Sequence, residues 1–106
     1  MAALARQTIG LSTAVTPVAA GASGDTAPVD ERGWFEVTVG GTSTTITLVV
    51  PGSAYGQARP DVSSGAVSNT TRRFGPLVPD LVDPATGVIT ISTSQQTAVT
   101  VAWVGI

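Results

Sequence analysis

Residues 33–50 read GWFEVTVGGTSTTITLVV, and this stretch decides the predicted fold. Alternate residues of an extended chain share one side, which sets Trp34, Glu36 and Thr38 opposite Phe35, Val37 and Val39. Gly40-Gly41 follows, and a glycine pair of this kind supplies the positive φ angles of a tight turn. A second β-rich run covers residues 42–50 before Pro51-Gly52 ends it. The stretch therefore predicts a β-hairpin.

Residues 83–104 repeat this arrangement. The segment from Asp83 to Gly87 is typical of a turn, and residues 88–93 are β-branched almost throughout. A polar connection of hairpin length, 94–97, leads to a run in which Val99, Val101 and Trp103 share one side. This pattern predicts a second hairpin, with its last strand deep in a sheet.

The other segments carry weaker patterns. Residues 1–24 mix isolated apolar residues with Pro17 and several glycines, which predicts either an N-terminal arm on a neighbouring molecule or an edge strand. Residues 52–70 form a Gly/Ser/Ala-rich excursion with a little strand, and residues 72–81 form an extended connector with two prolines. We therefore expect residues 25–106 to be one domain of the all-β class, an antiparallel, jelly-roll-like β-sandwich with an extended N-terminal arm.

Composition narrows the function further. The 106 residues are 42% hydrophobic, but only 11% are charged, against about 25% in an average globular protein. Such a surface is either solvated by threonine and serine hydroxyls or partly covered in an assembly. The net charge of −2 argues against nucleic acid as a partner, and no apolar run is long enough to span a membrane. The first residues lack the pattern of a secretory signal, and the absence of cysteine fits folding in the cytosol.

The chain has no cysteine, histidine or lysine. It therefore lacks a thiolate nucleophile, an imidazole base or ligand, and an amine for a Schiff base. The acids stand beside turn residues, where capping is the ordinary role, and we interpret them as solvated turn carboxylates: Asp25, Asp30, Glu31, Glu36, Asp61, Asp80 and Asp83. We expect no enzyme, no cofactor and no metal site.

Five residues are candidates for a binding interface: Arg72, Arg73, Phe74, Tyr55 and Trp34. Arginine and aromatic residues are enriched at binding hot spots. In the alternative interpretation, Phe74 anchors the connector in the core while the two arginines reach solvent or Asp80 and Asp83. Trp103 lies on a strongly apolar run and is predicted to be a core residue.

The order of several short segments resembles small head proteins of tailed bacteriophages that are encoded near the major capsid protein. The matching segments are Ala14-Val15-Thr16-Pro17, Gly24-Asp25-Thr26, Gly33-Trp34-Phe35-Glu36-Val37, Arg73-Phe74-Gly75-Pro76-Leu77, and the turn and strand from Asp83 to Ile91. The likeness covers nearly the whole chain, although the excursion from Tyr55 to Thr70 departs from it. It carries no catalytic residues.

The resemblance implies a virion structural protein, made in the host cytoplasm, that decorates and cements the outer surface of an icosahedral capsid. Its implied partners are the major capsid protein and further copies of itself, most simply a trimer on a local threefold axis. Two other roles remain open: a receptor- or carbohydrate-binding module, with Tyr55 and Trp34 in a groove, and a subunit of a tail tube or connector.

Overall fold

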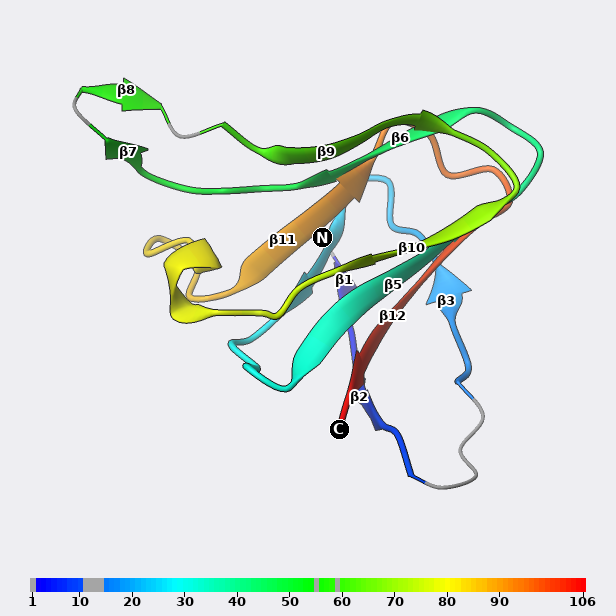
Figure 1. Ribbon diagram of the computed structural model, residues 1–106, viewed down its shortest axis with the longest axis horizontal. Coiled ribbons are helices and arrows are strands. Elements are labelled where there is room, and N and C mark those ends of the chain that lie inside the picture. Colours follow the sequence, from blue (N-terminus) through cyan, green and yellow to red (C-terminus); the bar gives the residue numbers. More distant parts are fainter. Residues whose placement is uncertain (1, 11–14, 55, 59) are drawn as a thin grey trace.

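A computed structural model describes residues 2–10, 15–54, 56–58 and 60–106 (Figure 1). The strands are β1 (Ala2–Ala3), β2 (Arg6–Thr8), β3 (Val18–Ala19), β4 (Asp25–Ala27), β5 (Gly33–Val39), β6 (Thr44–Leu48), β7 (Ser53–Ala54), β8 (Gln57–Ala58), β9 (Val62–Val67), β10 (Thr70–Phe74), β11 (Ile89–Thr93) and β12 (Val99–Gly105). One 3₁₀ turn, η1 (Pro79–Leu81), is the helical element of the described residues. The expected all-β class is confirmed.

Two sheets pack face to face. The first has the strand order β1-β4-β11-β6-β9, and the second has the order β10-β5-β12-β2, with β3 also paired to β12. The neighbours are antiparallel except for β1 with β4 and β2 with β12, which are parallel. Together they form the predicted β-sandwich. The small β7–β8 ribbon projects from one end of it (Figure 1).

The core lies between the inner faces of the two sheets. Along β5 and β6 the buried residues alternate with partly exposed ones, in the phase that the sequence predicts. Full burial of one such aliphatic or aromatic side chain contributes about 1.5–3 kcal/mol. The inner residues are Phe35, Val37, Val39, Ile46, Leu48, Ile89, Ile91, Val99 and Val101.

The two predicted hairpins are wrong, although their strands are right. β5 and β6 lie in different sheets, and so do β11 and β12, so that each pair is joined by an arch over the core. Two strands that each have one apolar face can pair side by side in one sheet, or they can lie in different sheets and pack across the core. The apolar alternation along each strand is the same in both arrangements. Gly40 does not adopt a positive φ angle; instead its N–H donates to the carbonyl of Ala98 at 3.0 Å, where the two arches meet.

The pairing that does occur joins distant segments. β5 pairs with β12 along seven residues, and β10 pairs with β5 along five. The predicted connector over 72–81 is therefore wrong at its start, because Arg72 to Phe74 are part of a strand. β6 pairs with β9, and the predicted excursion over 52–70 includes β9 itself as well as the short strands β7 and β8.

The described parts of the N-terminal segment lie along the edges of the two sheets. β1 adds to the first sheet beside β4, while β2 and β3 add to the second sheet beside β12. One lateral side of the sandwich is therefore covered by this segment. The opposite side, between the edge strands β9 and β10, carries no further strand of the described chain.

Candidate functional site

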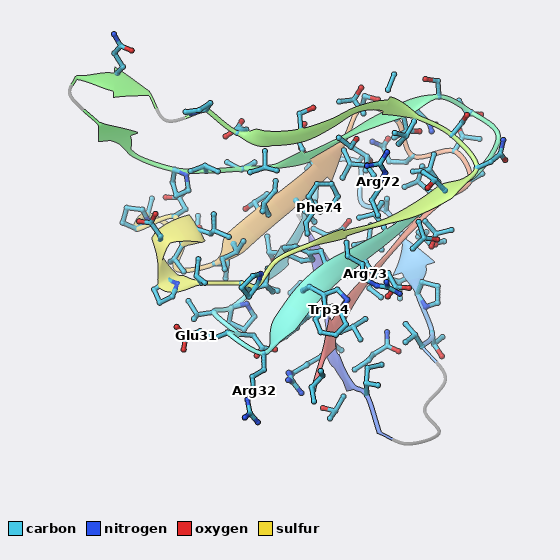
Figure 2. All side chains as sticks on the ribbon, in the orientation of Figure 1. Glu31, Arg32, Trp34, Arg72, Arg73 and Phe74 are labelled. Atoms are coloured by element: carbon cyan, nitrogen blue, oxygen red, sulfur yellow. The ribbon has the colours of Figure 1, made fainter. Side chains whose placement is uncertain are left out.

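The outer face of the second sheet carries a groove around Trp34. Trp34 is the second residue of β5, and its outward position leaves the indole half-buried. The groove has a volume of about 640 Å³ and is lined by Glu31, Arg32, Gly33, Trp34, Arg73, Gly75, Pro76 and Ile106. We call it the Trp34 groove; Figure 2 shows Arg32, Trp34 and Arg73 along it.

A close backbone approach builds the groove wall. A Cβ atom added at Gly75 would lie 2.7 Å from the Cβ of Trp34 and 3.0 Å from the carbonyl oxygen of Gly33, so only glycine fits there. The cis peptide bond between Gly75 and Pro76 follows directly. The N–H of Leu77, which is fully buried, then donates to the carbonyl of Gly33 at 3.1 Å. This segment is thereby held against the start of β5.

The groove combines apolar surface with guanidinium groups. Ile106 is 68% exposed, and the side chain of Arg73 is 66% exposed while its Nε donates to Glu36 Oε2 at 3.2 Å. The indole Nε1 of Trp34 is buried and finds no hydrogen-bond acceptor within the described residues. Such a surface suits contact with another molecule, because tryptophan and arginine give large contact areas and an acceptor on a partner can satisfy the indole.

Asp30, close to this groove, accepts hydrogen bonds from three separate parts of the chain. Its Oδ2 accepts from Arg6 Nε on β2 at 2.6 Å and from Trp103 Nε1 on β12 at 3.0 Å, and its Oδ1 accepts from the N–H of Arg32 at 3.2 Å. The hydrogen bond from Arg6, followed by that from Trp103, holds the pKa of Asp30 below its usual value. Asp30 therefore caps the turn at Arg32, as predicted, but its carboxylate is held by two distant side chains and is not simply solvated.

Asp25 departs from the same interpretation for a different reason. It lies on β4, is 2% exposed, and its Oδ2 accepts from the N–H of Gly21 at 3.1 Å. Its Oδ1 is buried without a hydrogen-bond partner in the described part of the chain. Burial raises the pKa of Asp25 above its usual value. Asp83 does cap a local backbone N–H group, that of Ala85, whereas Asp61 accepts from the N–H of Val50, eleven residues away.

The structure separates the five candidate interface residues. Trp34 and Arg73 meet at the groove, whereas Phe74 is buried in the core, as the alternative interpretation predicts. Arg72 and Arg73 lie on opposite sides of β10 (Figure 2). Arg73 pairs with Glu36 and not with Asp80 or Asp83, because β10 lies beside β5. Tyr55 lies outside the described residues, and Trp103 is half-buried against the core.

Sequence reasoning missed most of the groove. Glu31, Arg32 and Ile106 gave no local pattern, because the groove forms where the start of β5, the end of β12 and the segment after β10 converge. Arg73 lies near Trp34 because β10 pairs with β5. The local sequence of neither strand indicates this pairing. The one sequence feature that pointed to this part of the groove was the segment Arg73-Phe74-Gly75-Pro76.

Searches against protein-family models, curated proteins and solved structures find no match. Across the described residues, no group of three or more acidic side chains is placed to hold a metal ion. No helix in the described part of the chain is long and apolar enough to cross a membrane.

Proposed function

We propose that the chain is a virion structural protein that decorates the outer surface of an icosahedral phage capsid and cements neighbouring capsid subunits. The observation that supports this proposal is the Trp34 groove, an open surface that joins an aromatic ring, exposed Ile106 and guanidinium groups on a rigid sandwich. The resemblance to small phage head proteins supplies the identity of the partner, the major capsid protein.

Cementing requires contact area and many copies, and little chemistry. Each copy adds a modest free energy that the symmetric shell multiplies over all its sites, so moderate contacts suffice. A surface with few charges docks at a small desolvation cost, since few ions lose their water. A trimer on a local threefold axis would present three Trp34 grooves to three capsid subunits.

The test is to locate the chain in a reconstruction of the virion and to vary the groove. Trp34→Ala is expected to weaken capsid binding by about tenfold or more, because a buried tryptophan hot spot contributes about 2 kcal/mol or more. Arg32→Glu serves as a second variant, since Arg32 is exposed and its side chain plays no part in the core. Val18→Ala is the matched control: Val18 is 50% exposed on β3, outside the groove. Absence of the protein from the virion would refute the proposal.

A carbohydrate-binding module is the second candidate, and one observation favours it. The half-buried indole of Trp34 lies beside Glu31 and Arg32, and an aromatic ring with polar groups at its rim is suited to stack on a sugar. In that case, purified protein would bind defined glycans in an array, and Trp34→Ala would abolish the binding while leaving capsid occupancy unchanged.

A further inference from the structure

The edge strand β10 offers a free ladder of backbone hydrogen-bonding groups. β10 has β5 on one side and no strand of the described chain on the other. The other edges are short or irregular: β1, β2 and β3 have two or three residues, and β9 has a register shift opposite Thr45–Thr47 and a positive φ angle at Gly65. Bulges blunt an edge, so the regular five-residue edge of β10 is the one that can template a new strand.

The alternation of the ladder shows which groups are free. The carbonyls of Val99 and Gly105 accept from Ala20 and Ile9, so the odd-numbered residues of β12 face the N-terminal strands and the even-numbered ones face β5. The even-numbered residues of β5 therefore face β12, and its odd-numbered residues face β10.

The β10 partners of those odd-numbered residues are Thr70, Arg72 and Phe74, which consequently bond to β5. The backbone N–H and C=O groups of the remaining residues, Thr71 and Arg73, point outward at the free edge. A strand that adds to β10 would bond to these two residues.

An apolar opening lies beside this edge. It has a volume of about 440 Å³ between the two sheets, and its apolar lining comes from Leu48, Val62, Phe74, Pro76, Val78 and Leu81. Val62 is 47% exposed there. We call it the lateral opening. A strand added to β10 would point every second side chain into it, opposite Phe74.

Arg72 sets the charge of the added strand. It pairs in register with buried Val37, so its side chain is on the inner face of the sheet, at the rim of the sandwich. No hydrogen bond or ion pair of the Arg72 side chain occurs among the described residues. A side chain directly opposite Arg72 on a new strand would lie within reach of the guanidinium, and a carboxylate would be favoured there.

The same arginine disfavours a second copy of this chain as the occupant. Antiparallel pairing of two β10 strands over all five residues sets Arg72 directly opposite Arg72 of the other copy, and like charges facing each other destabilise a pair of strands. The N-terminal segment of another copy carries Arg6 and no acid before Asp25, so it offers Arg72 no carboxylate.

We propose that the β10 edge is a docking site for an extended acidic segment of a partner protein, which adds to the second sheet as a new edge strand. The segment carries an apolar side chain opposite Phe74 and, two residues away, a carboxylate opposite Arg72. Its backbone bonds to Thr71 and Arg73. This inference rests on the proposed function only for the identity of the partner, which would be a capsid subunit.

A synthetic peptide tests the site directly. The probe is a nine-residue peptide of alternating threonine and valine with one aspartate on the valine side; its control has lysine in place of aspartate. We expect the aspartate peptide to bind about fivefold more tightly than the control, a difference of about 1 kcal/mol for opposite charges across strands. Arg72→Glu should reverse this preference. On binding, the amide protons of Thr71 and Arg73 should become protected from hydrogen exchange.

Proline substitution tests the ladder. Thr71→Pro removes an outward N–H and spares the bonds to β5, so binding should fall about tenfold for the lost hydrogen bond while the fold persists. Thr71→Val is the matched control: it keeps the N–H, loses the hydroxyl that lies 3.2 Å from that of Thr38, and should bind as the wild type does. Arg72→Pro removes a bond to β5 and should destabilise the domain.

Equal binding of the two peptides, no binding at millimolar concentration, or amides of Thr71 and Arg73 that are already protected in the free monomer would each overturn the proposal. These results would do so even if Thr71→Pro failed to fold, because they use the wild type. Virion occupancy separates the two proposals. If the protein occupies the capsid but does not bind the peptide, only the proposed edge site is refuted. If it binds the peptide but is absent from virions, only the proposed capsid role is refuted.

Discussion

At the scale of single residues, two aspartates that look alike in the sequence have pKa values shifted in opposite directions. Each stands beside a small or turn-forming residue, and capping a turn was the reasonable expectation for both. Asp30 does cap the N–H of Arg32, but it also accepts from side chains 24 and 73 residues away, and Asp25 is buried in a strand. Burial and distant partners depend on the assembled sheets, so neighbouring residues do not reveal them.

Asp30→Asn should lower the free energy of unfolding by about 1–3 kcal/mol, because Arg6 loses the carboxylate that it contacts. The lowered pKa of Asp30 gives the sign of the pH effect. Its stabilising contribution is complete above the unfolded pKa of about 3.9 and is lost as pH falls through the lower folded value. Urea unfolding at pH 7 and below pH 4 measures both. Glu31→Gln, at an exposed position, is the control and should change little.

Asp25→Asn should have the opposite pH dependence. Because burial raises the folded pKa of Asp25, the wild-type fold binds its proton more tightly than the unfolded chain, and stability falls as pH rises from about 3.9 through the folded value. Asparagine does not titrate, so the variant does not lose stability in this way as pH rises. Its stability relative to the wild type should therefore increase between pH 4 and pH 7 in urea titrations. A relative stability that stayed constant with pH would contradict the raised pKa.

At the scale of elements, the sequence predicts strands well and their partners poorly. The inner and outer faces of β5 and β6 follow directly from alternation, and the turn at residues 83–87 is present, with Gly87 at a φ angle of 75°. Along β12 the alternation fails, because Ala102 and Val104 on the other face are buried too. The prediction of two hairpins was wrong because alternation indicates which face of a strand is buried but not which sheet the strand joins. The position of β10 beside β5 depends on the same missing information.

The two glycines of the first arch provide a test of this arrangement. A Cβ atom at Gly40 would lie 2.8 Å from that of Ala98, whereas one at Gly41 would meet nothing within 4 Å. Gly40→Ala should therefore destabilise the domain by about 1–3 kcal/mol, as expected for overpacking. Gly41→Ala should stay within about 0.5 kcal/mol of the wild type, as surface substitutions do. Thermal unfolding of the pair measures the difference. Equal losses would favour a hairpin turn over an arch.

At the scale of the whole molecule, the low charge content indicates a surface that is either solvated by threonine and serine hydroxyls or partly covered in an assembly. The described structure adds two places for partners, the Trp34 groove and the β10 edge, and both include Arg73. The sequence pointed to Arg73 and Trp34, while the groove depends on pairing between strands more than 30 residues apart. Because the groove depends on this long-range pairing, the sequence did not indicate its other lining residues.

We predict that the protein forms a homo-oligomer, most simply a trimer. The reason is the 11% charged residues, which leave a weakly solvated monomer surface. Light scattering at tens of micromolar protein, together with the stoichiometry in virions, measures the oligomeric state. A monomer in both settings would contradict the prediction. A dimer whose contact is β10 against β10 would contradict the repulsion expected between paired Arg72 side chains.

The position of β12 in the second sheet has a consequence for the newborn chain. β12 bonds to β5, β2 and β3, and all of these strands are synthesised before it. During translation the early strands therefore lack their common neighbour, and their apolar faces and open edges stay exposed. The second sheet can close only after β12 has left the ribosome, so β5, β2 and β3 cannot complete their pairing before that point. Sheets with such distant pairings fold in roughly milliseconds to seconds, and this is the interval in which the chain is most vulnerable to aggregation.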